Sequence, residues 1–110
     1  MGNRPPSCFH VATQYQASNG SVVSISTRSE PIVGYHVIKE CGMVFATSQS
    51  YGVNEDSNRY LVEAISLLVN QAAAQGANAV LSVAIEVKVI AQGGRAQVTV
   101  YGTAVVVAPK

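Results

Sequence analysis

Charged residues are scarce in this chain of 110 residues: they make up 12% of it, roughly half of their share in a typical soluble domain. The seven basic and six acidic residues give a formal net charge of +1, so we expect no basic surface of the kind that binds nucleic acid. A domain of this size has much surface for its volume, and neutral or apolar side chains must lie on that surface. The composition therefore favours a surface that partner subunits cover.

Signals for membrane insertion and for secretion are also missing. No apolar run is long enough to cross a bilayer, and the N-terminus has no apolar stretch of the kind found in signal peptides. The two cysteines, Cys8 and Cys41, do not have the paired spacing of a disulfide framework. We therefore expect a cytoplasmic protein with no membrane partner.

Apolar residues recur at the spacing of one helix face in the middle of the chain: Leu61, Ile65, Leu68, Val69 and Ala72. The pattern predicts a helix from about Glu55 to Gln75, with Asn54 as its N-cap and acidic residues in its first turn. Gly76 follows at the position where a helix C-terminus favours a residue with positive φ. We therefore predict a tight joint between this helix and the strand after it.

Alternating apolar residues predict strands on both sides of this helix. Lys39–Gly42 is expected to form a turn or a bulge, Ser48–Val53 a loop, and Gly93-Gly94 a hairpin turn. Residues 1–20 are expected to form an N-terminal tail, in which Cys8–Tyr15 is a candidate strand. The strands expected in the single domain of residues 21–110 are Val22–Thr27, Ile32–Ile38, Met43–Thr47, Val80–Ile90 and Ala96–Val107.

This order of elements predicts an α+β domain, an antiparallel sheet with one long helix packed on one face. Gly102 and Ala104 are small, which suits a close approach of the helix. The face expected beneath the helix carries Leu81, Val83, Ile85, Val87, Val98, Val100 and Val106. The opposite face has few charges for a face left to water, and we expect identical subunits to cover it; it carries Ser82, Ala84, Thr99, Tyr101, Thr103, Val105 and Val107.

Two stretches resemble a known family. Gly76-Ala77-Asn78-Ala79-Val80 and the later run from Val98 to Val105 are similar to the signature of the YbjQ-like family, which is labelled heavy-metal-binding. The resemblance extends over about residues 21–108. It implies a dodecin-like α+β subunit that assembles into a ring, commonly a pentamer or a pair of pentamers (a decamer). It implies no known reaction.

The metal label directs attention to four possible ligands: Cys8, His10, His36 and Cys41. Cys8 and His10 are two residues apart on one side of an extended segment but lie outside the stretch that resembles the family. His36 and Cys41 lie inside that stretch, five residues apart across the expected turn, and are the candidate ligands for a transition metal such as zinc or copper. The chain lacks the paired cysteine motifs of closed zinc sites. The alternative is that these residues have no metal role.

Motifs for catalysis are absent from the sequence. It has no GxSxG motif and no cysteine–histidine signature of an activated nucleophile. Glu86 is expected to be solvated or ion-paired, and Gln92–Arg95 lacks the helix and the GK[ST] ending of a phosphate loop. We therefore predict no catalytic and no cofactor-binding residue.

Two functions remain open on these grounds. The first is a non-enzymatic oligomeric scaffold or a module that binds a small ligand or a partner. The alternative is a heavy-metal-binding or metal-handling protein. An enzyme with a site between subunits is a third reading, for which the sequence names no residue.

Overall fold

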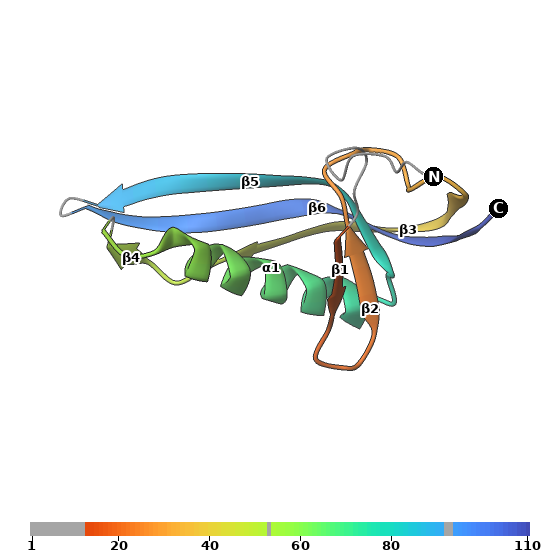
Figure 1. Ribbon diagram of the computed structural model, residues 1–110, viewed down its shortest axis with the longest axis horizontal. Helices are drawn as coiled ribbons and strands as arrows, with labels where there is room; N and C mark the ends of the chain where they lie inside the picture. Colours follow the sequence, from red (N-terminus) through yellow and green to blue (C-terminus); the bar gives the residue numbers. More distant parts are fainter. Residues whose placement is uncertain (1–12, 53, 92–93) are drawn as a thin grey trace, which may run out of the picture.

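The computed structural model of the protein describes residues 13–52, 54–91 and 94–110. Within these ranges the chain forms six strands and one helix (Figure 1). No helix in these ranges is long and apolar enough to cross a membrane. The elements are β1 (Thr13–Gln16), β2 (Val22–Ile25), β3 (Tyr35–Thr47), β4 (Tyr51–Gly52), α1 (Ser57–Ala74), β5 (Ala79–Ala91) and β6 (Arg95–Pro109).

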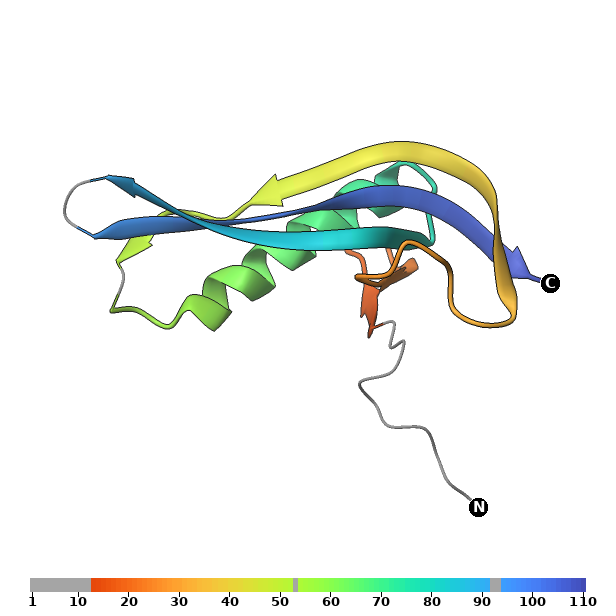
Figure 2. The same cartoon turned by 90° about the horizontal axis from the view of Figure 1, so that it is seen from above.

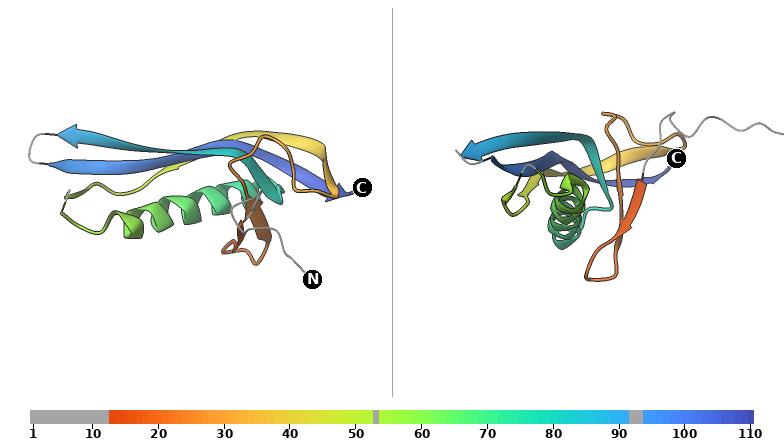
Figure 3. Two further views of the ribbon diagram at one scale, coloured as in Figure 1. Left: turned by 45° about the horizontal axis from the view of Figure 1, so that its top comes forward. Right: turned by 60° about the vertical axis from the view of Figure 1, so that its left-hand side comes forward.

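The strands form one sheet in the order β1-β2-β5-β6-β3, and β4 pairs with the start of β6. The long strands β3, β5 and β6 run along the molecule, and α1 lies on one side of them (Figures 2 and 3). We call the side of the sheet that contacts α1 the inner face and the opposite side the outer face. The fold is therefore α+β, with the helix on one face as predicted.

The sheet is mixed, so the prediction of a wholly antiparallel sheet is wrong. β2 pairs with β5 in parallel, through Ser24 with Ala79 and Ile25 with Val80. The remaining pairs are antiparallel. Alternation in the sequence indicates that a segment is extended but does not indicate which strand it pairs with. β2 and β5 are also separated in the sequence by β3, β4 and α1.

The helix begins two residues later than predicted and ends as predicted. Asp56, not Asn54, is the N-cap, and its carboxylate accepts a hydrogen bond from the Asn58 N–H at 3.0 Å. At the other end Gly76 has a φ of 82°. The N–H of Gly76 donates to the Ala73 carbonyl and that of Ala77 to the Ala72 carbonyl, the pair of hydrogen bonds of a Schellman motif.

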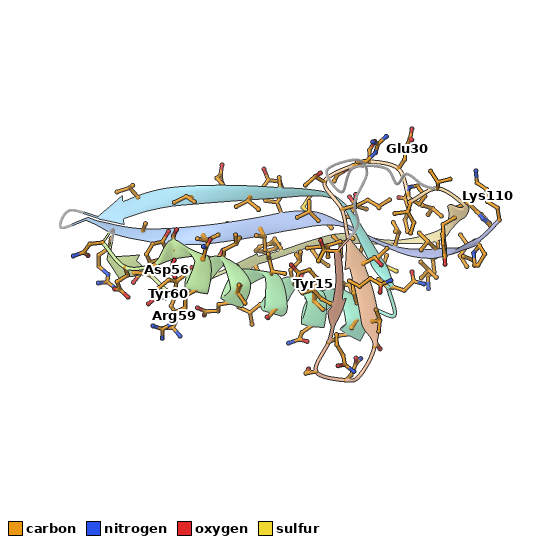
Figure 4. The ribbon with its side chains drawn as sticks, viewed as in Figure 1. Tyr15, Glu30, Asp56, Arg59, Tyr60 and Lys110 are labelled. Atoms are coloured by element: carbon orange, nitrogen blue, oxygen red, sulfur yellow. The ribbon has the colours of Figure 1, made fainter. Side chains whose placement is uncertain are left out.

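Hydrogen bonds of Glu55 explain the displaced start of the helix. Its carboxylate accepts hydrogen bonds from the Gly52 N–H at 3.0 Å and from the Tyr60 hydroxyl at 2.8 Å. The Tyr60 ring stacks on Tyr51 with 4.5 Å between centroids, and the Arg59 guanidinium lies over it (Figure 4). Glu55 therefore closes the turn before the helix instead of belonging to its first turn.

The main hydrophobic core lies between α1 and the inner face of β3 and β6. β6 contributes Val98, Val100 and Ala104, all buried. Val98 and Val100 were predicted to lie beneath the helix, and Ala104 was predicted to allow its close approach. Gly102 lies between them, where β5 and β6 approach closely. The helix contributes Tyr60, Ala64, Ile65, Leu68, Val69, Ala72 and Ala73.

β5 changes the face that it presents between Leu81 and Ala84. The register with β6 shifts there, and Ser82 has a φ of 56°, a conformation uncommon for a residue other than glycine. Leu81 consequently joins a small cluster on the outer face, whereas Val83 joins the main core. Strict alternation placed both on one face, and that part of the prediction is wrong because a bulge inserts an extra residue.

β3 is one strand of thirteen residues where two were predicted. Lys39–Gly42 forms a bulge and not a turn: the register with β6 shifts between Val37 and Lys39 and again between Glu40 and Gly42. Gly42 has a φ of 109°, which glycine adopts without steric cost. β1 takes up the end of the candidate strand Cys8–Tyr15, whose residues 8–12 lie outside the described ranges.

Two side-chain amides complete the hydrogen bonding of the sheet. Gln71 on α1 accepts from the Phe45 N–H at 2.9 Å and donates to the Phe45 carbonyl at 3.1 Å. Asn78 accepts from the Val107 N–H at 2.8 Å and donates to the Val107 carbonyl at 2.9 Å. Each amide thus takes the place of a neighbouring strand, which satisfies strand-edge backbone groups.

We predict that two glycines are needed for different reasons. Gly76→Ala should lower the free energy of unfolding by about 1 kcal/mol, because alanine is strained at a positive φ. A steric clash adds nothing to this loss, since the space around the residue is open. Gly102→Ala should cost more, since its Cβ would lie 2.8 Å from the Leu81 carbonyl oxygen and 2.8 Å from Val80 Cγ1. Urea denaturation measures both. The reverse order of the two losses would contradict this assignment.

A second prediction concerns pH. The hydrogen bond from the Gly52 N–H, and after it that from Tyr60, hold the pKa of Glu55 below its ordinary value of 4.5. A lowered pKa contributes stability that is fully present above pH 4.5 and is lost as the pH falls through the lowered value. Glu55→Gln should therefore be less stable than the parent at neutral pH and approach it in acid. Urea midpoints across the acid range test this, with the exposed Glu86→Gln as the control; a constant gap would contradict it.

Candidate functional site

Part of β5 lies beyond the reach of the helix. From Ala84 to Ala91 β5 pairs with β6 alone, because the pairing with β2 involves only Ala79 and Val80. The outward edge of β5 in this segment therefore has no neighbouring strand among the described residues. Unpaired strand edges present backbone N–H and C=O groups that can pair with another chain.

Three large apolar side chains lie along this segment, on the inner face. Ile85 is 52% exposed, Val87 58% and Val89 68%. We call these three residues the β5 stripe. They pair with Val100, Val98 and Ala96 of β6, which are buried, but α1 packs mainly against β3 and β6. The prediction that the helix covers Ile85 and Val87 is therefore wrong.

A second apolar surface lies on the outer face. Met43 is 74% exposed, Phe45 61% and Tyr101 39%, and Phe45 and Tyr101 are directly paired across β3 and β6. We call these three residues the outer patch. Two apolar surfaces on opposite faces of one sheet are more than a small monomer usually leaves to water.

The outer face is only partly open, in contrast to the prediction. Leu81, Val105 and Ala79 are buried there in the small cluster, and Val37 and Val107 pack against it. The segment between β2 and β3 passes over this end of the face (Figure 1). Tyr101 and Thr103, expected on this face, are exposed and half-buried respectively.

The two candidate metal ligands lie far apart on β3. His36 is exposed and pairs with Ala108 near the start of the strand, while Cys41 is half-buried against the main core. The register with β6 places them roughly 12 Å apart along the strand, too far for one zinc or copper ion bound at about 2.0–2.3 Å from each ligand. Cys8 and His10 lie outside the described residues.

No group of three or more His, Cys, Asp and Glu side chains that could hold a metal occurs in the part of the chain that the structure describes.

The cluster of Glu55, Tyr60 and Arg95 at the other end of the molecule is unsuited to proton transfer near neutral pH. The pKa of Glu55 is lowered, and the hydrogen bond to Glu55 raises the pKa of Tyr60. Both shifts favour the ordinary protonation states. Arg95 donates hydrogen bonds to Ser50 and tethers the chain before β4 to the start of β6.

A family model described as "Putative heavy-metal-binding" and named YbjQ_1 matches residues 14–108. The chain belongs to the YbjQ family. The family match begins within β1, inside the stretch that was expected to be a tail. No curated protein matches the sequence.

A solved structure supports the fold of this YbjQ-family chain. It is a crystal structure of a protein of unknown function from Pediococcus pentosaceus ATCC 25745, described as belonging to the DUF74 family. The two chains share 20% identity with a TM-score of 0.58, over 78% of this chain and 98% of the other. At this identity the likeness concerns the fold alone.

Sequence reasoning placed the metal candidates first and missed the β5 stripe. A signal for the stripe was present, because the chain offers one helix to cover a sheet with three long strands.

We predict that a single subunit does not chelate zinc or copper through His36 and Cys41. Protein purified without a metal-affinity tag should show no saturable thermal shift with either ion, and His36→Ala and Cys41→Ser should leave any small shift unchanged. Differential scanning fluorimetry and elemental analysis measure this. A shift that saturates at one ion per chain and disappears in either variant would contradict the prediction.

Proposed function

We propose that this YbjQ-family chain is a non-enzymatic subunit of a homo-oligomeric ring, a scaffold in which the β5 stripe and the free edge of β5 pack against a neighbouring copy. The exposure of Ile85, Val87 and Val89 beside an unpaired strand edge is the observation that carries the proposal. Apolar side chains next to an open edge favour association by hydrophobic burial and by backbone pairing together.

The sheet offers two different edges, which supports a ring. β5 forms the edge at one side along Ala84–Ala91, and β3 forms the edge at the other side. A contact between different surfaces of two copies runs head to tail, and it closes into a ring when the rotation per subunit fits. A pentamer or a decamer, the size implied by the resemblance, is our working assembly.

The hydrogen bonds between the Gln71 side chain and Phe45 restrict where a neighbour can pair with β3. The Gln71 amide occupies the Phe45 N–H and carbonyl, so that part of the β3 edge is closed to a neighbouring strand. Contact with a neighbour would then involve β3 on the other side of its bulges, between Tyr35 and Glu40. The bulges fix which residues a neighbour can pair with.

The low charge of the chain supports the same proposal. Along the free segment of β5 the only charged residues are Glu86 and Lys88, and alternation places these two on the outer face, opposite the stripe. The stripe itself carries no charge that would have to be desolvated when a neighbour covers it.

A metal-handling role is the second candidate, because the family is described as heavy-metal-binding. It would require ligands from more than one copy, since His36 and Cys41 are too far apart within one chain. In a ring, His36 of each subunit could approach a ligand of the next. The candidate thus depends on the assembly and does not compete with it.

We predict that Val87→Lys breaks the assembly. The parent should elute as an oligomer, and light scattering should give a pentamer or decamer; the variant should shift towards the monomer because a lysine at an apolar interface would be desolvated without a partner. Far-UV circular dichroism should show that α1 is retained.

Val62→Lys is the matched control for this experiment. Val62 lies on α1 and is 59% exposed, against 58% for Val87, so the two variants make the same chemical change at equal exposure. We expect Val62→Lys to assemble like the parent. Equal disruption by both variants, or a parent that is a folded monomer at micromolar concentration, would contradict the proposal.

A further inference from the structure

A cavity of about 190 Å³ lies on the outer face of the sheet, on the side away from α1. Its floor consists of apolar side chains of three strands: Val22 of β2, Ala79 and Leu81 of β5, and Val107 of β6. Ala79 and Leu81 are 4% and 7% exposed. The cavity thus has a packed floor that one chain builds by itself.

The segment between β2 and β3 forms the other wall. Pro31 and Ile32, both half-buried, line the cavity from this segment. Three backbone hydrogen bonds anchor the segment to β5. The Ser82 N–H donates to the Arg28 carbonyl at 2.8 Å, the Val83 N–H donates to the Ser26 carbonyl at 2.9 Å, and the Ser26 N–H donates to the Val80 carbonyl at 3.0 Å. The bulge of β5 at Ser82 therefore helps to hold the wall in place.

Several polar side chains line this cavity. Gln14 and Ser24 are cross-strand partners on β1 and β2 and both line it, as does Tyr35. None of these three side chains forms a hydrogen bond to a residue in the described ranges. Ser26 is 7% exposed and its hydroxyl oxygen accepts from the Arg28 N–H at 3.1 Å, which leaves its proton available as a donor.

Among the residues that the structure describes, no charged residue lines the cavity. A ligand that carried a full charge would lose hydration on entering and find no opposite charge to compensate. Hydroxyl and amide groups, by contrast, can exchange hydrogen bonds with the serines, with Gln14 and with Tyr35. The chemistry of the lining therefore selects an uncharged ligand with an apolar body and one polar side.

The volume suits a small ligand. A cavity of about 150 Å³ in another protein holds benzene, so one of about 190 Å³ accommodates a six-membered ring with one or two small substituents. We propose that the cavity is a binding site for a small neutral molecule of this class, a ring that bears a hydroxyl or carboxamide group. The proposal does not depend on the assembly, because all of the described lining residues belong to one chain.

The test uses benzamide as the probe and benzoate as its charged counterpart. Titration of the isotope-labelled full chain with benzamide should give saturable amide shifts in nuclear magnetic resonance spectra, centred on Ser24, Ile32 and Leu81, with a Kd on the order of 1 mM for so small a molecule. Benzoate should bind at least tenfold more weakly. Equal binding of the two, shifts centred elsewhere, or no saturation with benzamide would overturn the proposal.

Variants locate the site. Ser24→Ile places a larger apolar side chain in the cavity and should abolish the benzamide shifts while the melting temperature is kept or raised. Ser66→Ile makes the same exchange on the exposed side of α1 and should bind benzamide like the parent. Benzamide binding that survives Ser24→Ile would overturn the proposal.

Tyr35→Phe provides an independent reading should Ser24→Ile fold poorly. It removes one hydroxyl from the lining at a position where that hydroxyl has no partner in the described fold. A lost hydrogen bond of ordinary strength weakens binding by about two- to tenfold. An unchanged Kd for benzamide would exclude Tyr35 from the site and contradict the proposal. In a Val87→Lys monomer the parent affinity should persist, which separates this test from that of the assembly.

Discussion

The placement of the single helix on the sheet is the constraint on which the rest of this structure depends. α1 packs mainly against β3 and β6 and only slightly against β5. Ile85, Val87 and Val89 of β5 are therefore left exposed on the inner face, and our proposal of an assembly rests on this exposure.

The bulge at Ser82 divides β5 into two segments with different roles. Before it, Val80 faces the main core, while Ala79 and Leu81 face the small cluster beneath the segment between β2 and β3. After it, β5 extends past the helix and carries the stripe. One strand thus supplies the floor of a cavity and the exposed stripe on which the proposed assembly rests. The bulge between the two segments allows them to present different faces.

The elements that depend on local sequence could be predicted, and those that depend on distant partners could not. Gly76, the helix face and the last two strands follow from spacing and from φ preference, and the structure agrees. The parallel pairing of β2 and the register shift at Ser82 arise from tertiary contacts that periodicity does not encode. The β5 stripe could not be predicted for the same reason: whether Val87 is buried depends on where α1 lies, and not on Val87 itself.

The side-chain amides of Gln71 and Asn78 each donate one hydrogen bond through nitrogen and accept another through oxygen. An acid of the same shape can only receive. Conversion of either amide to a carboxylate, as in the slow deamidation of an ageing protein, would set a negative charge against a backbone carbonyl with almost no change in volume. The hydrogen bonding of the Phe45 and Val107 carbonyls therefore depends on whether Gln71 and Asn78 keep their side-chain amide nitrogen atoms.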